Sequence, residues 1–147
     1  MSCLETYATL RVFSREIAPE EIGRLLAIDG SKLRPINPGS RYRHEREHHY
    51  WAWSTQSRVL ALDGLQHVGA IIEVLRGKEV QLDRLRQLGC DLDICCYWVS
   101  SGQGGPRLDI ATLRALARLE LAIWWDVYFA DAAEYVEKTT DSPINDT

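Results

Sequence analysis

Three histidines within six residues are the side chains best suited to chemistry: His44, His48 and His49. Imidazoles bind transition metals, and the adjacent Glu45 and Glu47 could contribute carboxylate ligands. On a strand, which the local sequence favours, His44 and His48 share one face while His49 points away. No third ligand is evident for a helical or an extended backbone. His44 and His48 are therefore only weak metal candidates, and we expect no cofactor.

The same segment carries cations and rings of the kind that bind nucleic acid: Arg41, Arg43, Arg46, Tyr42 and Tyr50. Arginines contact phosphates and tyrosines stack on bases. The interleaved glutamates and the net charge of −4 oppose this use. The simpler interpretation is an exposed edge strand that its charges keep soluble, so we do not expect a nucleic-acid partner.

Residue types that build nucleophilic sites are present, but their surroundings are not those of known motifs. Ser54, Asp63 and His67 lack a Gly-x-Ser-x-Gly elbow. The glycines of residues 101–106 lack the Lys-Ser/Thr of a phosphate-binding loop. No set of residues meets the geometric requirements of an active site, which favours a protein that is not an enzyme.

The four cysteines do not form a metal-binding pattern: Cys3, Cys90, Cys95 and Cys96. No Cys-x-x-Cys pair exists, and neighbours on a strand point to opposite faces. We expect reduced, buried, small apolar residues.

The last hydrophobic stretch, residues 120–130, alternates as a strand does and is rich in β-forming residues. One face is apolar and is predicted to be core: Leu121, Ile123, Trp125, Val127 and Phe129. The other is aromatic with a central carboxylate: Ala122, Trp124, Asp126, Tyr128 and Ala130. Leaving Asp126 buried and unpaired would be costly, so this second face should be partly solvated.

A first strand over residues 4–13 also mixes aromatic rings with a charge, because Tyr7 and Arg11 share a face. If this strand neighbours the last one, Arg11 and Asp126 could pair across the sheet. A strand over residues 47–54 adds a further ring-rich face. The candidate binding residues are therefore Tyr7, Arg11, His49, Trp51, Trp53, Trp124, Asp126 and Tyr128. Trp, Tyr and Arg are enriched at interface hot spots, although a solvated sheet face or homodimer packing would use the same residues.

The candidate binding residues lie on predicted strands, so they require a sheet, and predicted helices would pack against it. Strands are predicted at 4–13, 47–54, 91–99 and 120–130, and helices at 19–28, 62–75, 78–88 and after Asp109. Residues 29–42 are predicted to be an irregular connection. The pattern favours an α+β two-layer sandwich of about four strands with helices on one face.

A chain of 147 residues is typical of one domain. We assign the domain to residues 1–130 and a polar C-terminal tail to 131–147. No apolar run approaches the ~20 residues that span a bilayer, and no signal peptide is evident at the start. We therefore expect a cytoplasmic protein without a membrane partner.

Several segments together resemble a bacterial family of small domains of unknown function. They are YATLRVFS with PEEIGRLL, the turn at residues 33–35, WAWST, and GGPRLDIATLRALARLELAIWWDVYF, with the triplet of residues 126–128 the most characteristic. The resemblance covers about residues 4–130 and implies a ferredoxin-like arrangement and no assigned catalytic residue. Some members are found near toxin genes, which implies an immunity-type role.

A non-catalytic protein-binding module, of the immunity type, is thus the leading hypothesis. The alternatives are a protein that binds a small ligand or metal through residues 44–49, and a homo-oligomeric structural domain.

Overall fold

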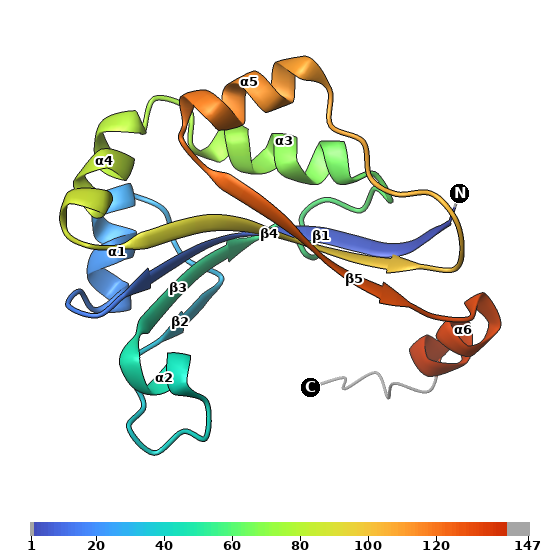
Figure 1. Cartoon of the computed structure of the whole chain (residues 1–147), viewed down its shortest axis with the longest axis horizontal. Coiled ribbons are helices and arrows are strands. Elements are labelled where there is room, and N and C mark those ends of the chain that lie inside the picture. Colours follow the sequence, from blue (N-terminus) through green and yellow to red (C-terminus); the bar gives the residue numbers. More distant parts are fainter. Residues whose placement is uncertain (1, 141–147) are drawn as a thin grey trace.

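The computed structural model of the chain describes residues 2–140. These residues contain a five-stranded mixed sheet (Figure 1). The strands are β1 (Cys3–Ser14), β2 (Lys32–Arg34), β3 (His49–Ser54), β4 (Asp91–Ser100) and β5 (Ala122–Phe129). Their order is β2-β3-β1-β4-β5. The longest strand, β1, is central and antiparallel to both neighbours, whereas β4 and β5 are parallel.

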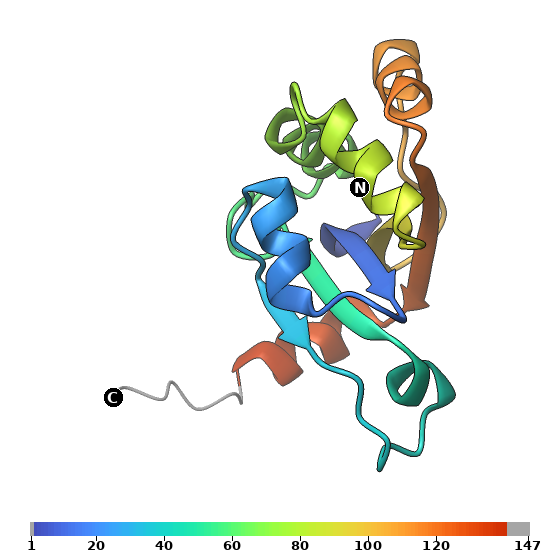
Figure 2. The same ribbon diagram turned by 90° about the vertical axis from the view of Figure 1, so that its left-hand side faces the viewer.

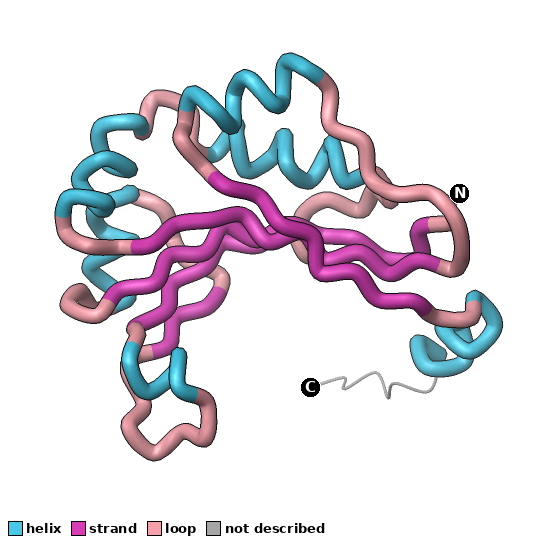
Figure 3. The backbone as a smooth tube through the Cα atoms, in the orientation of Figure 1, coloured by secondary structure: helices cyan, strands magenta, loops and turns pink. Residues whose placement is uncertain are grey.

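Helices form a layer on one face of this sheet. They are α1 (Pro19–Leu26), α3 (Gly64–Val74), α4 (Glu79–Gln87) and α5 (Ile110–Arg118). Figure 3 shows α3 and α5 above the strands, with α4 and α1 at the left end of the molecule. The short α2 (Arg43–Glu47) and the C-terminal α6 (Ala132–Thr140) lie on the other side, at opposite ends of the sheet (Figures 1 and 2). Within residues 2–140, no helix covers the middle of that second face.

Local sequence explains where three of the covering helices begin. Pro19 opens α1, where a missing N–H costs nothing. Asp63 and Asp109 cap α3 and α5 by accepting hydrogen bonds from the backbone amides of Leu65 and Thr112. These three signals are readable in the sequence, and the predicted helices are confirmed to within a few residues.

The core lies between the helical layer and the sheet. Leu10, Val12 and Ile94 contribute from the central strands, and Trp51 is its largest fully buried side chain. The Trp51 indole lies against the chain that follows α1, where a Cβ placed on Gly30 would come within 2.5 Å of Nε1. Glycine at this position is therefore a packing requirement.

Two predictions about the fold need correction. The sheet has five strands rather than about four, because residues 32–34 pair with β3 instead of forming only an irregular connection. Residues 43–47 form α2 and do not extend β3. The predicted tail begins with α6, while residues 141–147 lie outside the described part of the chain. The ferredoxin-like arrangement is not confirmed.

No helix in residues 2–140 is both long enough and apolar enough to cross a membrane.

Candidate functional site

The face of the sheet that α1, α3, α4 and α5 leave uncovered is called the open face below. Strand alternation and pairing register identify the main side chains that lie on this face. They are Lys32 and Arg34 of β2, Tyr50 of β3, Tyr7, Thr9, Arg11 and Phe13 of β1, Asp93, Cys95 and Tyr97 of β4, and Trp124, Asp126 and Tyr128 of β5. The face thus combines aromatic rings with charged groups of both signs.

An ion pair lies at the middle of the open face. Arg11 donates from Nε to Asp93 Oδ1 at 2.7 Å and from Nη2 to Oδ2 at 2.6 Å. The two side chains are only 21% and 27% exposed, and the residues are direct cross-strand partners. The guanidinium also contacts two rings, with its Cζ 5.2 Å from the centroid of Phe13 and 5.3 Å from that of Trp124. Arg11 is therefore fixed in place, and it holds the Trp124 ring over the sheet.

Three tyrosines form a continuous aromatic cluster next to this pair. The Tyr7 and Tyr97 rings stack with centroids 4.7 Å apart, and Tyr97 and Tyr128 lie 5.2 Å apart. Burial raises the pKa of Tyr7 to about 12, so its hydroxyl stays neutral at physiological pH. The Tyr128 hydroxyl donates to Asp126 at 3.2 Å, which supplies Asp126 with a polar contact at the sheet surface.

The edge strand β5 exposes more apolar surface than a solvated strand needs. Its exposed fractions are 43% for Trp124, 43% for Val127, 50% for Tyr128 and 79% for Phe129. The prediction that Val127 and Phe129 belong to the core was wrong. The helical layer covers the start of β5, and the strand then runs beyond it toward α6 (Figure 1).

The structure brings five of the eight candidate binding residues together and separates the other three. Tyr7, Arg11, Trp124, Asp126 and Tyr128 all lie on the open face. The remaining three candidates, all of β3, point to the helical layer. Tyr50 is paired with Phe13 on the open face, and side chains alternate along a strand, so the residues at the alternate positions of β3 face the other way.

Each of these three side chains has a structural environment. Trp51 is fully buried. Trp53 packs against the core, and Arg58 lies over its ring at 5.1 Å. His49 accepts a hydrogen bond at Nδ1 from the backbone amide of Ile36 at 3.1 Å. We therefore do not include them in the open-face site.

The suggested pair of Arg11 and Asp126 does not form. Strand β4 lies between β1 and β5, so Arg11 pairs with Asp93 of that intervening strand. Asp93 was not among the predicted site residues. The alternation of residues 91–99 does place Asp93, Cys95 and Tyr97 on one face, and this signal was sufficient to identify them.

The histidines and cysteines show no arrangement for metal chemistry. Within the described residues, no group of three or more His, Cys, Asp or Glu side chains could hold a metal ion. His44 lies on α2 and His48 is its C-cap residue. All four cysteines are free, and burial raises the pKa of each thiol, to about 12 for Cys96. Such thiols are poor nucleophiles at neutral pH.

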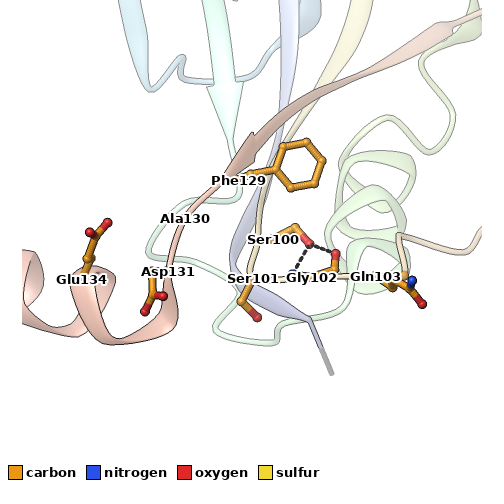
Figure 4. A pocket seen from close by; sticks show the side chains of 9 residues that line it. Ser100, Ser101, Gly102, Gln103, Phe129, Ala130, Asp131 and Glu134 are labelled. Atoms are coloured by element: carbon orange, nitrogen blue, oxygen red, sulfur yellow. Dashed lines mark hydrogen bonds between the residues drawn. The ribbon is translucent and has the colours of Figure 1, made fainter.

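A cavity of about 770 Å³ lies where β4 and β5 end, between the loop after β4 and the start of α6. Its lining is Ser100, Ser101, Gly102, Gln103, Gly104, Phe129, Ala130, Asp131 and Glu134. Figure 4 shows Glu134 and Gln103 at opposite ends of it. The Ser100 hydroxyl donates to the Gly102 carbonyl at 2.7 Å, and that of Ser101 donates to the Ser2 carbonyl at 3.2 Å. Within the described residues neither serine is paired with a base, so the described lining supplies no activated nucleophile.

Comparison with known proteins places this chain in a family. The model of the family described as Domain of unknown function (DUF4279) matches residues 4–130, and the chain belongs to that family. No curated protein and no solved structure matches the chain.

Proposed function

We propose that the protein is a non-catalytic protein-binding module that docks a partner on the β5 side of its open face. The observation that carries the proposal is the pair of exposed rings that β5 presents on the open face, Trp124 at 43% and Tyr128 at 50% exposure. Apolar clusters of this kind rimmed by charge are typical of interaction sites. Tryptophan and tyrosine are also the residues that contribute most to hot spots.

The support beneath these rings favours binding over a merely solvated face. Arg11 fixes the Trp124 ring from below, and Tyr97 packs against Tyr128. Side chains that are ordered before binding lose little conformational entropy when a partner covers them. Among the described residues β5 is an edge strand, and an extended segment of the partner can hydrogen-bond to the backbone groups along that edge.

The partner class proposed is a protein toxin, and the chain would then act as its immunity protein. This part of the proposal rests on the family resemblance carried by the sequence motifs. The aromatic open face supplies a docking surface compatible with it. Self-association through the same edge is the competing use of the surface.

Capture of a partner by purified protein tests the proposal. Wild type is compared with a Trp124→Ala, Tyr128→Ala variant in a pull-down from the source cell, and captured proteins are re-tested pairwise after purification. We expect the double variant to lose binding at least ~10-fold, since each ring is a hot-spot candidate. The variant should stay folded with a modestly lower thermal midpoint, because both rings are about half exposed and lose only their contacts with Arg11 and Tyr97.

The matched control removes apolar side chains that are exposed elsewhere. Ile110 is 66% exposed and Val80 is 78% exposed, and both lie on helices of the covering layer, α5 and α4. An Ile110→Ala, Val80→Ala variant should bind as wild type does. Equal loss of binding in both variants would contradict a specific role for the open face, as would unfolding of the Trp124→Ala, Tyr128→Ala variant.

A further inference from the structure

A second cavity, of about 360 Å³, lies at the other end of the open face, against α2. Its lining is Arg11, Phe13, Lys32, Arg34, His44 and Tyr50. Three strands and one helix contribute residues to it: β1, β2, β3 and α2. Three of the six residues are permanent cations, and no carboxylate is among them.

Two carboxylates next to the cavity are already engaged in ion pairs. Asp93 takes both of its hydrogen bonds from Arg11. Glu45 accepts from Arg34 Nη1 at 3.2 Å and from the Ser40 hydroxyl at 2.5 Å. Among the described residues, no carboxylate lies within ion-pair distance of the exposed Lys32 ammonium. The cavity therefore has a surplus of positive charge.

Arg34 has an unused pair of donors. Its Nε and Nη2 are shielded from solvent and have no hydrogen-bond acceptor within the described part of the chain. Shielded donors of a charged group without an acceptor are costly, so they are rarely left in this state. Nε and Nη2 also form the edge with which Arg11 holds Asp93, which is the edge that binds a carboxylate or phosphate with two parallel hydrogen bonds.

Two contacts hold the Arg34 guanidinium in this position. Its Cζ lies 5.0 Å from the centroid of the Tyr50 ring, and Nη1 is anchored by Glu45. Its side chain is only 21% exposed. The Phe13 and Tyr50 rings, 5.2 Å apart, form an apolar wall beside it. Lys32 and His44 are exposed at the rim and can turn to admit and then contact an anion.

We propose that this cavity, formed by Lys32, Arg34 and His44 beside Tyr50 and Phe13, binds a small organic oxyanion, a carboxylate or a phosphate ester. Arg34 takes two of its oxygens through Nε and Nη2, Lys32 adds a third donor, and the rings contact the apolar part of the ligand. This site lies at the opposite end of the open face from the proposed protein-docking surface on β5. Arg11 contacts both, but the donors proposed for the anion are those of Arg34 and Lys32.

Titration of ¹⁵N-labelled protein with three probes tests the proposal: phenyl phosphate, benzoate and inorganic phosphate. We expect saturable shifts of the Lys32, Arg34 and Tyr50 amides, with a Kd in the range of about 1 mM or tighter. Phenyl phosphate binding more tightly than benzoate would identify a phosphate ester as the ligand class, and the reverse would identify a carboxylate. Either result supports the site.

Two variants and one control make the test specific. Lys32→Gln removes an exposed charge, and Arg34→Lys keeps the charge but loses the two-donor edge. Each should weaken binding of the preferred probe at least ~5-fold, as expected for a lost charge-assisted contact. Arg84→Gln removes one exposed charge from α4, on the helical side, and should change affinity less than ~2-fold.

Two results would overturn the proposal. One is the absence of saturable shifts at these amides up to about 20 mM of every probe. The other is an equal loss of affinity in Lys32→Gln, Arg34→Lys and Arg84→Gln, which would show general charge attraction. Lys32→Gln alone decides the matter if Arg34→Lys does not fold.

Discussion

The ion pair of Arg11 and Asp93 is the support on which the open face depends, and its energy can be measured by a double-mutant cycle. The pair is bidentate and about three-quarters buried. Exposed pairs contribute about 0–1 kcal/mol, and breaking a fully buried pair costs about 3–5 kcal/mol. We therefore expect Asp93→Ala to lower the free energy of unfolding by about 2 kcal/mol.

Arg11→Met should cost more, about 3 kcal/mol, because the guanidinium also loses contacts with Phe13 and Trp124 that are worth about 0.5–1 kcal/mol each. If the two residues act as one unit, the double variant loses about 3.5 kcal/mol, and the coupling energy is about 1.5 kcal/mol. Urea unfolding with linear extrapolation measures each value, and an unchanged m-value is required for the comparison.

The exposed pair of Arg24 and Glu21 on α1 is the matched control. Its side chains are 69% and 41% exposed, and it spans three residues of one helix. The same cycle there should show a much smaller coupling that ~1 M salt abolishes, since the screening length is then about 3 Å. A coupling energy below about 0.5 kcal/mol for Arg11 and Asp93 would refute a structural role for their pair.

Three further outcomes follow from buried contacts. Thr55→Val should lower the free energy of unfolding by about 2–4 kcal/mol. The Thr55 hydroxyl contacts His67 Nδ1 at 2.5 Å and accepts a hydrogen bond from a β1 amide at 2.9 Å. Valine would leave both of these buried polar groups without this partner. Gly30→Ala should cost about 1–3 kcal/mol in urea unfolding, because the new Cβ would overlap the Trp51 indole. Burial raises the pKa of Cys96 from 9.0 to about 12. The folded state thus retains this proton longer than the unfolded state does, and the urea midpoint should fall as pH rises from about 9 toward 12.

Conservative variants provide the controls for these three outcomes. Thr55→Ser keeps the hydroxyl and should retain most of the stability. Gly69→Ala, at a site in α3 with nothing within 4 Å of the new Cβ, should stabilise the protein by about 0.5–1 kcal/mol. Cys96→Ala should flatten the alkaline loss. A Thr55→Val protein as stable as wild type, a harmless Gly30→Ala, or a midpoint that is constant up to pH ~11 would contradict the respective reasoning.

The sequence was sufficient for the parts of the fold that local patterns determine. The alternation of residues 120–130 correctly separated Trp124, Asp126 and Tyr128 from Trp125. Asp109 marked the start of one helix. Each of these signals depends only on residues that are close in the sequence, so it can be recognised without knowledge of the tertiary structure.

The errors arose where the answer depended on strand order and on the extent of the helical layer. Alternation of β3 separates Trp51 from Tyr50, but it does not say which of them faces the helices. That choice is made by pairing with β1, where Tyr50 faces Phe13. Likewise, β4 separates Arg11 from Asp126, and only the sheet order reveals Asp93 as the partner. Short β2 has too few residues for periodicity to detect.

Site-specific photocrosslinking gives the sharpest test of the open face as a docking surface. A photoreactive phenylalanine analogue is placed at Tyr128, on the open face, and in a second sample at Val80, which is exposed on α4. A protein-docking role predicts a covalent adduct between the Tyr128-substituted protein and one different protein of the source cell, and no such adduct from position 80. Adducts of equal yield from both positions, or adducts from position 128 with other copies of this chain only, would contradict it.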